Sequence, residues 1–276
     1  VKDSPPPLDE ERKAVNAGPA SANYAAPSTA AARYRLKLAA SDAAAGDNFG
    51  GAIGIDGPSV AIEGDTIVVG ATQAGNGGPG VAYVLRASDG AQLAKLTAAD
   101  GAAGDKFGQS VAISGDTIVV GAAGCDHGGC ENIPGAAYVF RTSDGWSTYT
   151  EIKLTAPDAA SDDHFGKSVA IDGDTVVVGR PQWYNDGSGS VYLFLTTDGG
   201  ATYAQLAKLT APDAAAKDMF GWSVAIDGET VVATAPYVDD AGANSGSAYV
   251  FATPYGSVLR AHDGTTADRE YDCIPR

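Results

Sequence analysis

The sequence predicts an all-β fold built from four copies of one antiparallel unit, and three observations carry this prediction. A Phe-Gly pair recurs at intervals of 58, 58 and 55 residues. Each pair precedes an alternating apolar and polar segment, a two-residue turn signal and a continuous β-branched run. Each copy then reaches an aromatic segment of the type Ala-Tyr-Val-Phe. The four pairs are Phe49-Gly50, Phe107-Gly108, Phe165-Gly166 and Phe220-Gly221.

Within each copy the expected strands follow a fixed order, which the third copy illustrates. Residues 168–172 alternate apolar and polar side chains, as a strand between two environments does. After an Asp-Gly turn, residues 175–179 form a β-branched run that is typical of a strand buried on both faces. The aromatic strand covers residues 190–194, and a Thr-Asp-Gly turn leads to a fourth strand at 204–211. Four antiparallel strands repeated radially form the blades of a β-propeller.

The length of the chain sets the number of blades. Four copies of roughly 57 residues occupy most of the 276 residues, so the sequence predicts a small propeller of four blades with four strands each. Residues 34–40 resemble the fourth strand of the other units and precede the first copy. We expect them to pair beside residues 247–251 as the outermost strand of the last blade, which closes the ring. Residues 256–260 compete for that position, and an open array completed by another chain is the alternative.

The repeated motif resembles the FG-GAP repeat, the blade unit of the integrin α-subunit propeller and of many secreted or surface proteins. The similarity lies in Phe-Gly-x-Ser-Val, Gly-Asp-Thr and a Val-Val-Gly-Ala-Pro-like segment, and it covers roughly residues 34–252. The resemblance implies a calcium loop between the first two strands of a blade. The turn at residues 171–175 is too short to supply the roughly six to eight oxygen ligands of calcium, so we expect no inherited calcium site.

A second acidic pattern, Asp-x4-Asp, precedes every Phe-Gly pair, and its second members are Asp47, Asp105, Asp163 and Asp218. Because it recurs in every copy, we interpret it as a turn device whose carboxylate accepts backbone N–H bonds; a cation site is the alternative. The best single calcium candidate in the sequence is the loop that carries Asp239, Asp240 and Asn244, and a solvated loop is the preferred interpretation. We otherwise expect no cofactor.

The charge of the protein limits its partners. Lys and Arg number 18 and Asp and Glu 34, which gives a formal net charge of −16. This balance argues against nucleic-acid backbones and anionic membrane surfaces as partners, whereas it permits a basic protein partner or cations. No segment reaches the run of about 18 apolar residues that a membrane helix needs.

The cysteines and the start of the chain bear on its compartment. Cys125 and Cys130 flank a short Gly-rich loop and predict a disulfide, with free thiols or a metal site that includes His127 as alternatives. A disulfide implies an oxidising compartment, and Cys273 is left as a free thiol or an intermolecular bridge. The start at Val1 fits removal of a targeting peptide. We therefore expect a non-cytosolic location: secreted, cell-surface or organelle lumen.

The two ends differ in composition from the repeats. Residues 1–33 are rich in Pro and Ala, and we interpret them as an extended anchoring arm, with the propeller at 34–262 and a tail at 263–276. A polyproline II contact with a partner is expected at Pro5, Pro6 and Pro7. Further candidate partner contacts are the aromatic residues Trp183, Tyr184 and Trp222, with a packed loop aromatic as the alternative for the first two.

The sequence carries no motif that indicates catalysis. Nucleophile-elbow, His-Glu-x-x-His and phosphate-loop motifs are absent from it. His164 occupies a position where the other copies carry Asn48, Lys106 and Met219, so we expect it to be exposed and unspecialised. The favoured hypothesis is a non-catalytic interaction or structural subunit, docked in a larger assembly through its loops and terminal arms. A variant is an extrinsic, lumen-facing subunit of a membrane complex, and the rival is a secreted glycan-binding or glycan-cleaving protein.

Overall fold

The computed structural model describes residues 36–51, 59–73, 77–124, 133–182, 186–240 and 242–253. The described strands all belong to the unit Lys37–Arg276. All regular secondary structure in the described residues is β-strand, which confirms the all-β prediction. Within the same residues no helix is long and apolar enough to cross a membrane.

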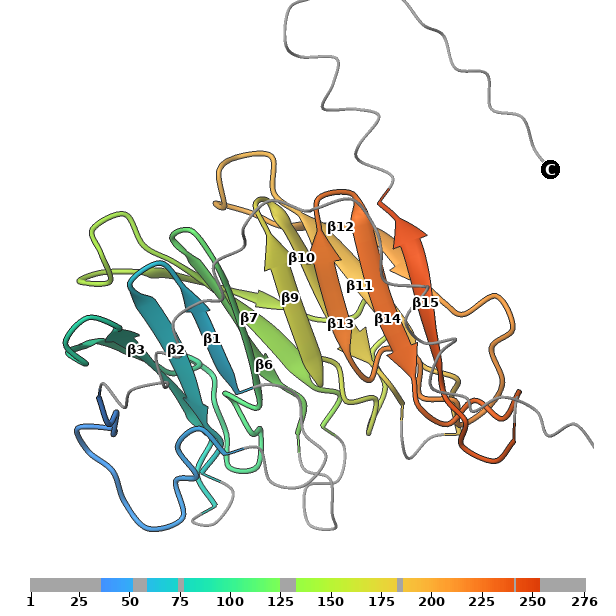
Figure 1. Cartoon of the computed structure of the whole chain (residues 1–276), viewed down its shortest axis with the longest axis horizontal. Helices are drawn as coiled ribbons and strands as arrows, with labels where there is room; N and C mark the ends of the chain where they lie inside the picture. Colours follow the sequence, from blue (N-terminus) through green and yellow to red (C-terminus); the bar gives the residue numbers. More distant parts are fainter. Residues whose placement is uncertain are drawn as a thin grey trace, which may run out of the picture. The chain divides into compact units, whose positions relative to one another are not determined.

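Fifteen described strands form four antiparallel sheets, one for each copy of the repeat (Figure 1). The first blade contains β1 (Val60–Glu63), β2 (Thr66–Ala71), β3 (Val81–Arg86) and β4 (Gln92–Leu96). The second contains β5 (Ser110–Ser114), β6 (Thr117–Ala122), β7 (Ala136–Arg141) and β8 (Thr150–Leu154). The third contains β9 (Ser168–Asp172), β10 (Thr175–Arg180), β11 (Ser190–Leu195) and β12 (Ala204–Leu209). The fourth contains β13 (Val224–Asp227), β14 (Thr230–Ala235) and β15 (Ser247–Ala252). Each sheet is a meander, with neighbouring strands in chain order.

The closing strand predicted for the fourth blade is not found among the described residues. Its sheet has three strands, and β15 lies at the edge among the described residues. The described part of residues 34–40 forms no strand, and no described residue of this segment pairs with residues 247–251. Leu38 and Ala40 pack in an apolar cluster of the first blade that includes Tyr83, as Leu96 of the fourth strand of the first blade packs against the second blade. Burial of these two side chains holds the segment against the first blade, and the closure of the ring by this strand is not observed.

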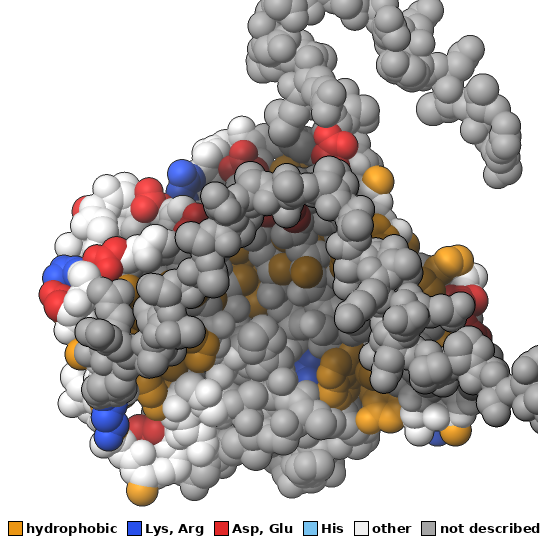
Figure 2. All heavy atoms as spheres, viewed as in Figure 1, with side chains coloured by type: hydrophobic (Ala, Val, Ile, Leu, Met, Phe, Trp, Pro, Cys, Tyr) orange, Lys and Arg blue, Asp and Glu red, His pale blue; other side chains and the backbone are white. Residues whose placement is uncertain are grey.

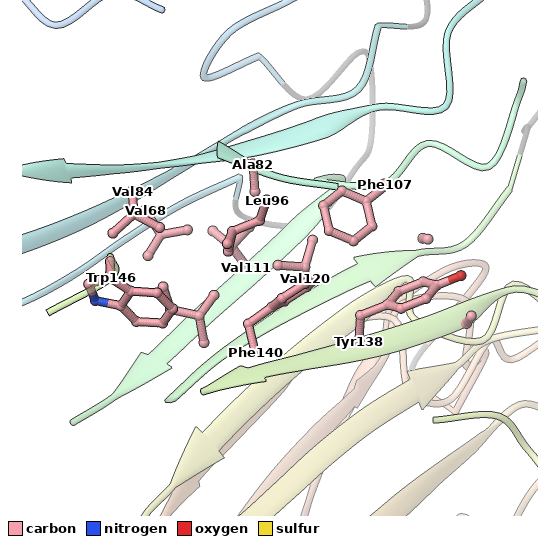
Figure 3. Close-up of a cluster of buried hydrophobic side chains, with 13 residues drawn as sticks. Val68, Ala82, Val84, Leu96, Phe107, Val111, Val120, Tyr138, Phe140 and Trp146 are labelled. Atoms are coloured by element: carbon pink, nitrogen blue, oxygen red, sulfur yellow. The ribbon is translucent and has the colours of Figure 1, made fainter. Parts of the chain in front are cut away.

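Apolar side chains fill the space between consecutive blades. The inner strand β1 contacts β5, β5 contacts β9 and β9 contacts β13; a contact of similar extent between β13 and β1 is not found among the described residues. Figure 3 shows the cluster between the first two blades, where Val68 and Val84 lie near Val111, Phe140 and Trp146. The first three blades therefore each bury one face of their sheet against the next blade, as in a propeller.

The Phe-Gly pair joins neighbouring blades. Phe165 is fully buried and forms an isolated parallel bridge with Gly135 of the second blade. A Cβ atom on Gly121 in β6 would lie 2.0 Å from the carbonyl oxygen of Gly166, so this strand needs glycine for the two backbones to approach. The same oxygen accepts a hydrogen bond of 2.9 Å from the hydroxyl of Ser110. The repeated Phe-Gly, Ser-Val and Val-Val-Gly segments thus make one contact between neighbouring blades, which we name the joint.

Candidate functional site

The repeated aspartates lie in the loops that join one blade to the next. We name the edge formed by these loops the aspartate-loop edge; its loops cover residues 41–48, 99–106, 157–164 and 212–219. In each loop the second aspartate accepts a hydrogen bond on Oδ2 from the backbone N–H three residues earlier, as a turn device does. The donor and acceptor pairs are Ala44–Asp47 (2.7 Å), Ala102–Asp105 (2.7 Å), Ala160–Asp163 (2.6 Å) and Ala215–Asp218 (2.7 Å).

The first aspartate of each loop contacts the blade that follows it. Asp100 accepts hydrogen bonds from the phenol of Tyr138 on β7 (2.8 Å) and from Nζ of Lys153 on β8 (2.5 Å). The bond from Lys153, with that from Tyr138, lowers the pKa of Asp100 below its ordinary value. Burial, with the bond to Asp100, raises the pKa of Tyr138 well above the ordinary range. The carboxylate is therefore ionised and the phenol protonated near neutral pH.

This trio recurs, although the sequence analysis did not identify it. The equivalent sets are Asp42–Tyr83–Lys95 in the first blade and Asp158–Tyr192–Lys208 in the third. In the fourth blade, burial and the nearby charge of Asp213 raise the pKa of Tyr249 to about 12, but the phenol of Tyr249 has no hydrogen-bond partner among the described residues. The signal was present in the sequence, because the tyrosine of the aromatic strand and the lysine of the fourth strand recur with the aspartates.

The third blade adds a guanidinium to its trio. Arg180 ends β10 at a position where the other blades carry alanine, and its side chain is 4% exposed. Its Nη2 lies 2.5 Å from Oδ2 of Asp163, and its Nη1 lies 3.0 Å from Oδ1 of Asp158. Nη1 also donates a hydrogen bond of 2.6 Å to the phenol oxygen of Tyr192. Gln182 Nε2 donates to the other oxygen of Asp163 at 3.1 Å, so that this fully buried carboxylate is compensated on both oxygens.

Burial alone would raise the pKa of Asp158. Hydrogen bonds from Lys208 and Tyr192, together with the nearby charge of Arg180, outweigh burial and hold that pKa well below its usual range. The third-blade site is therefore a network of two carboxylates and two cations. Such a network is electrically balanced near neutral pH.

The second blade has an open cavity at the equivalent place. Ala122 and Gly124 occupy the positions of Arg180 and Gln182. A cavity of about 260 Å³ results, which we name the second-blade pocket, and its lining includes Asp100, Asp105, Ala122, Pro134, Tyr138 and Lys153. Asp105 makes its one side-chain hydrogen bond to the backbone of Ala102 through Oδ2, and within the described structure its Oδ1 accepts none.

The fourth blade carries a larger acidic pocket of about 490 Å³, whose lining includes Asp213, Asp218, Tyr237, Asp239, Asp240 and Asn244. Oδ1 of Asp239 accepts the backbone N–H of Asn244 at 2.7 Å, which closes the candidate calcium loop on itself. Across the described ranges, no group of three or more His, Cys, Asp or Glu side chains could hold a metal ion.

On the face seen in Figure 2, acidic side chains lie along the rim and hydrophobic ones gather nearer the middle.

Of the remaining partner-contact and disulfide candidates, only Trp222 lies among the described residues. Trp222 is half-buried, with Nζ of Lys167 at 5.0 Å from its ring centroid and Tyr237 packed edge-on against it. Outside the described residues lie the predicted Cys125–Cys130 disulfide, Cys273, Trp183, Tyr184 and Pro5 to Pro7.

The expectation that His164 is exposed is wrong, because its side chain is 3% exposed. The four equivalent residues all have positive φ angles, between 54° and 59°; they are Asn48, Lys106, His164 and Met219. The position is thus a left-handed turn residue in every blade. The constraint at this position is on the backbone, so side chains of different types occupy it.

Comparison with known families finds the FG-GAP repeat in four segments: residues 35–85, 87–140, 149–194 and 203–251. These matches cover most of the chain, and the chain belongs to the FG-GAP repeat family. No curated protein matches it. Among solved structures, it is similar to the computationally designed Ika4 protein, with 15% identity, 80% of this chain and 98% of that chain covered, and a TM-score of 0.46. The designed Ika8 protein has 15% identity, covers 70% and 44%, and gives a TM-score of 0.42.

Proposed function

We propose that this chain is a non-catalytic interaction propeller that binds a basic protein partner at its aspartate-loop edge, as a subunit of a larger assembly. The observation that carries the proposal is the excess of carboxylates in the pockets of that edge. Four aspartates line the fourth-blade pocket, and its lining lysine, Lys217, lies 3.1 Å from Asp186 of the neighbouring loop. Blades joined by buried Phe-Gly contacts hold these carboxylates on a rigid support, which limits the entropy lost on binding.

The proposal includes a location for the protein outside the cytosol. FG-GAP repeat proteins are often extracellular or lumenal, and this supports a non-cytosolic location. A peripheral place on the lumenal side of a membrane complex is one form of the same proposal. No cofactor is assigned, because the carboxylates of the loops are used for turns and for contacts with tyrosine and lysine.

The test is the native mass of the full chain, isolated gently from its source, at low and at high salt. A complex well above the 27.7 kDa of one chain that dissociates as salt rises would support an electrostatic partner contact. An Asp239→Asn and Asp240→Asn double variant should weaken the complex, because it removes two carboxylates from the fourth-blade pocket. A mass of one chain at every salt concentration, or turnover of an oligosaccharide, would contradict the proposal.

A further inference from the structure

We propose that the second-blade pocket binds the guanidinium group of an arginine side chain that the protein partner presents. The inference rests on the proposed function and names the chemistry by which one pocket would recognise the partner. It comes from a comparison between two blades of the same chain, in which one blade already holds a guanidinium at the corresponding carboxylates.

The third blade shows what these carboxylates hold. Arg180 places its guanidinium between Asp158 and Asp163 and donates to Tyr192. Every group that contacts this guanidinium has a counterpart in the second blade at the same place in the repeat: Asp100, Asp105 and Tyr138. The lysine of the trio is also present in both blades, as Lys208 and Lys153. The second blade therefore retains the receptor side of the contact and lacks the arginine.

The charge of the two sites differs by one unit. In the third blade two carboxylates face two cations, Arg180 and Lys208. In the second blade Asp100 is paired with Lys153, which leaves the charge of Asp105 without a cation among the described residues. An incoming guanidinium would restore the balance seen in the third blade. Charge-assisted hydrogen bonds of this kind are stronger than neutral ones.

The second-blade pocket also has the space for an arginine side chain. Ala122 leaves open the volume that the side chain of Arg180 fills in the third blade, and the cavity there is about 260 Å³. At Gly124 the side chain of Ile133 lies close to the backbone, because an added Cβ would be 2.9 Å from its Cγ2. Pro134 in the lining offers an apolar surface to the methylene groups of an arginine, which commonly bury against such surfaces. Two separated acceptors favour the planar fork of arginine over the single ammonium of lysine.

The other blades fit the inference less well. In the first blade Gln73 is retained, and its Nε2 lies 3.4 Å from Oδ1 of Asp47. In the fourth blade the described residues supply no lysine to Asp213, so that the arrangement around the third-blade guanidinium is not reproduced there. The first blade has the same carboxylates, phenol and ammonium group as the second. The second blade differs because Oδ1 of its second aspartate, Asp105, accepts no hydrogen bond within the described structure.

The experiment titrates the full chain with Nα-acetyl-arginine N-methylamide, which carries a guanidinium as its only charge, and follows the backbone amide signals of the pocket residues. The lysine analogue is the matched probe, and we expect it to bind at least fivefold more weakly. Ala122→Arg installs the side chain of the third blade and should weaken binding of the arginine probe at least tenfold. Asp105→Asn, which keeps an acceptor for Ala102, should weaken it by a similar factor.

Three outcomes would overturn the inference. Equal binding of the arginine probe to the wild-type chain and to a folded Ala122→Arg chain would show that the probe lies elsewhere. Loss of probe binding in Ala122→Arg without any weakening of the native complex would show that the partner does not use the pocket. Absence of probe binding together with an intact, salt-sensitive complex would refute the guanidinium site and leave the proposed function standing.

Discussion

At the scale of single residues, one substitution between blades changes the chemistry of the aspartate-loop edge. Arg180 stands where the second blade has Ala122, and its guanidinium compensates the fully buried carboxylate of Asp163. The arginine is therefore part of the core of the third blade as well as part of a polar network. Its removal has a different cost from the removal of a surface cation.

We expect Arg180→Ala to lower the free energy of unfolding by about 3 kcal/mol, because it leaves the carboxylate of Asp163 buried beside an unfilled space. Urea denaturation measures the loss. The double variant with Asp163→Asn should recover part of it, since the remaining side chain is then neutral. If the double variant is less stable than Arg180→Ala by the full cost of the single Asp163→Asn change, the two side chains are not coupled as described.

Gly121 gives a second prediction at this scale. Gly121→Ala should cost about 3 kcal/mol, because its Cβ would lie 2.0 Å from the carbonyl oxygen of Gly166 and would push two blades apart. The matched control is Gly115→Asn, at a hairpin turn with φ +55° and nothing within 4 Å of an added Cβ. Asparagine tolerates that conformation, so the control should cost less than about 1 kcal/mol. Equal losses in urea denaturation would contradict the close approach of the blades.

At the scale of the elements, the strand order could be predicted because each strand has a local sequence pattern that identifies it. Alternation, an Asp-Gly or Ser-Gly turn and a β-branched run place the first two strands without long-range information. The contacts of the aspartate loops could not be predicted in this way. Asp100 and Lys153 are 53 residues apart, and their contact depends on how one blade is placed on the next. Only the joint recurrence of aspartate, tyrosine and lysine pointed to it.

The Asp–Tyr–Lys trio predicts a response to pH. The bond from Lys153 and that from Tyr138 lower the pKa of Asp100 in the folded state. The stability that this trio supplies is thus complete above the unfolded pKa of about 3.9 and is lost as pH falls through the folded pKa. The stability difference between wild-type and Asp100→Asn should be constant near neutral pH and shrink below about pH 4. Lys153→Met should raise the pKa of Asp100 in an NMR titration; an unchanged value would contradict the lysine contact.

The serine at the joint between blades gives a matched pair. The hydroxyl of Ser168 donates to the carbonyl oxygen of Gly221 at 2.9 Å, in a buried position. Ser168→Ala should therefore cost about 1 kcal/mol or slightly more. Ser223 is the equivalent residue of the fourth blade, is exposed and faces no following blade in the described structure. Ser223→Ala should be neutral. A comparable loss for both variants would show that the fourth blade meets another blade in solution.

At the scale of the whole molecule, the number of blades followed from the repeat, whereas the closure of the ring did not. Residues 34–40 have the pattern of a fourth strand, but a pattern does not specify which neighbouring sheet a segment meets. In the structure, Leu38 and Ala40 pack on the first blade, as Leu96 packs between the first and second blades. In the fourth blade, Val250 on β15 is 70% exposed. Thr234 occupies the position that Gly121 holds in the second blade. A further blade could therefore not approach this strand as closely as the third blade approaches the second at Gly121.

The response of the whole molecule to calcium follows from how its carboxylates are used. The hairpin turns between the first two strands, such as that after β9, have two residues and leave no loop for a calcium ion. The aspartate loops bond their carboxylates to backbone N–H groups, tyrosine and lysine. We therefore expect the melting temperature of the full chain to be unchanged between excess EDTA and millimolar calcium. A rise of several degrees with calcium, absent with magnesium, would show that some of these carboxylates serve as ligands, and Asp239→Asn would then test whether the fourth-blade pocket supplies them.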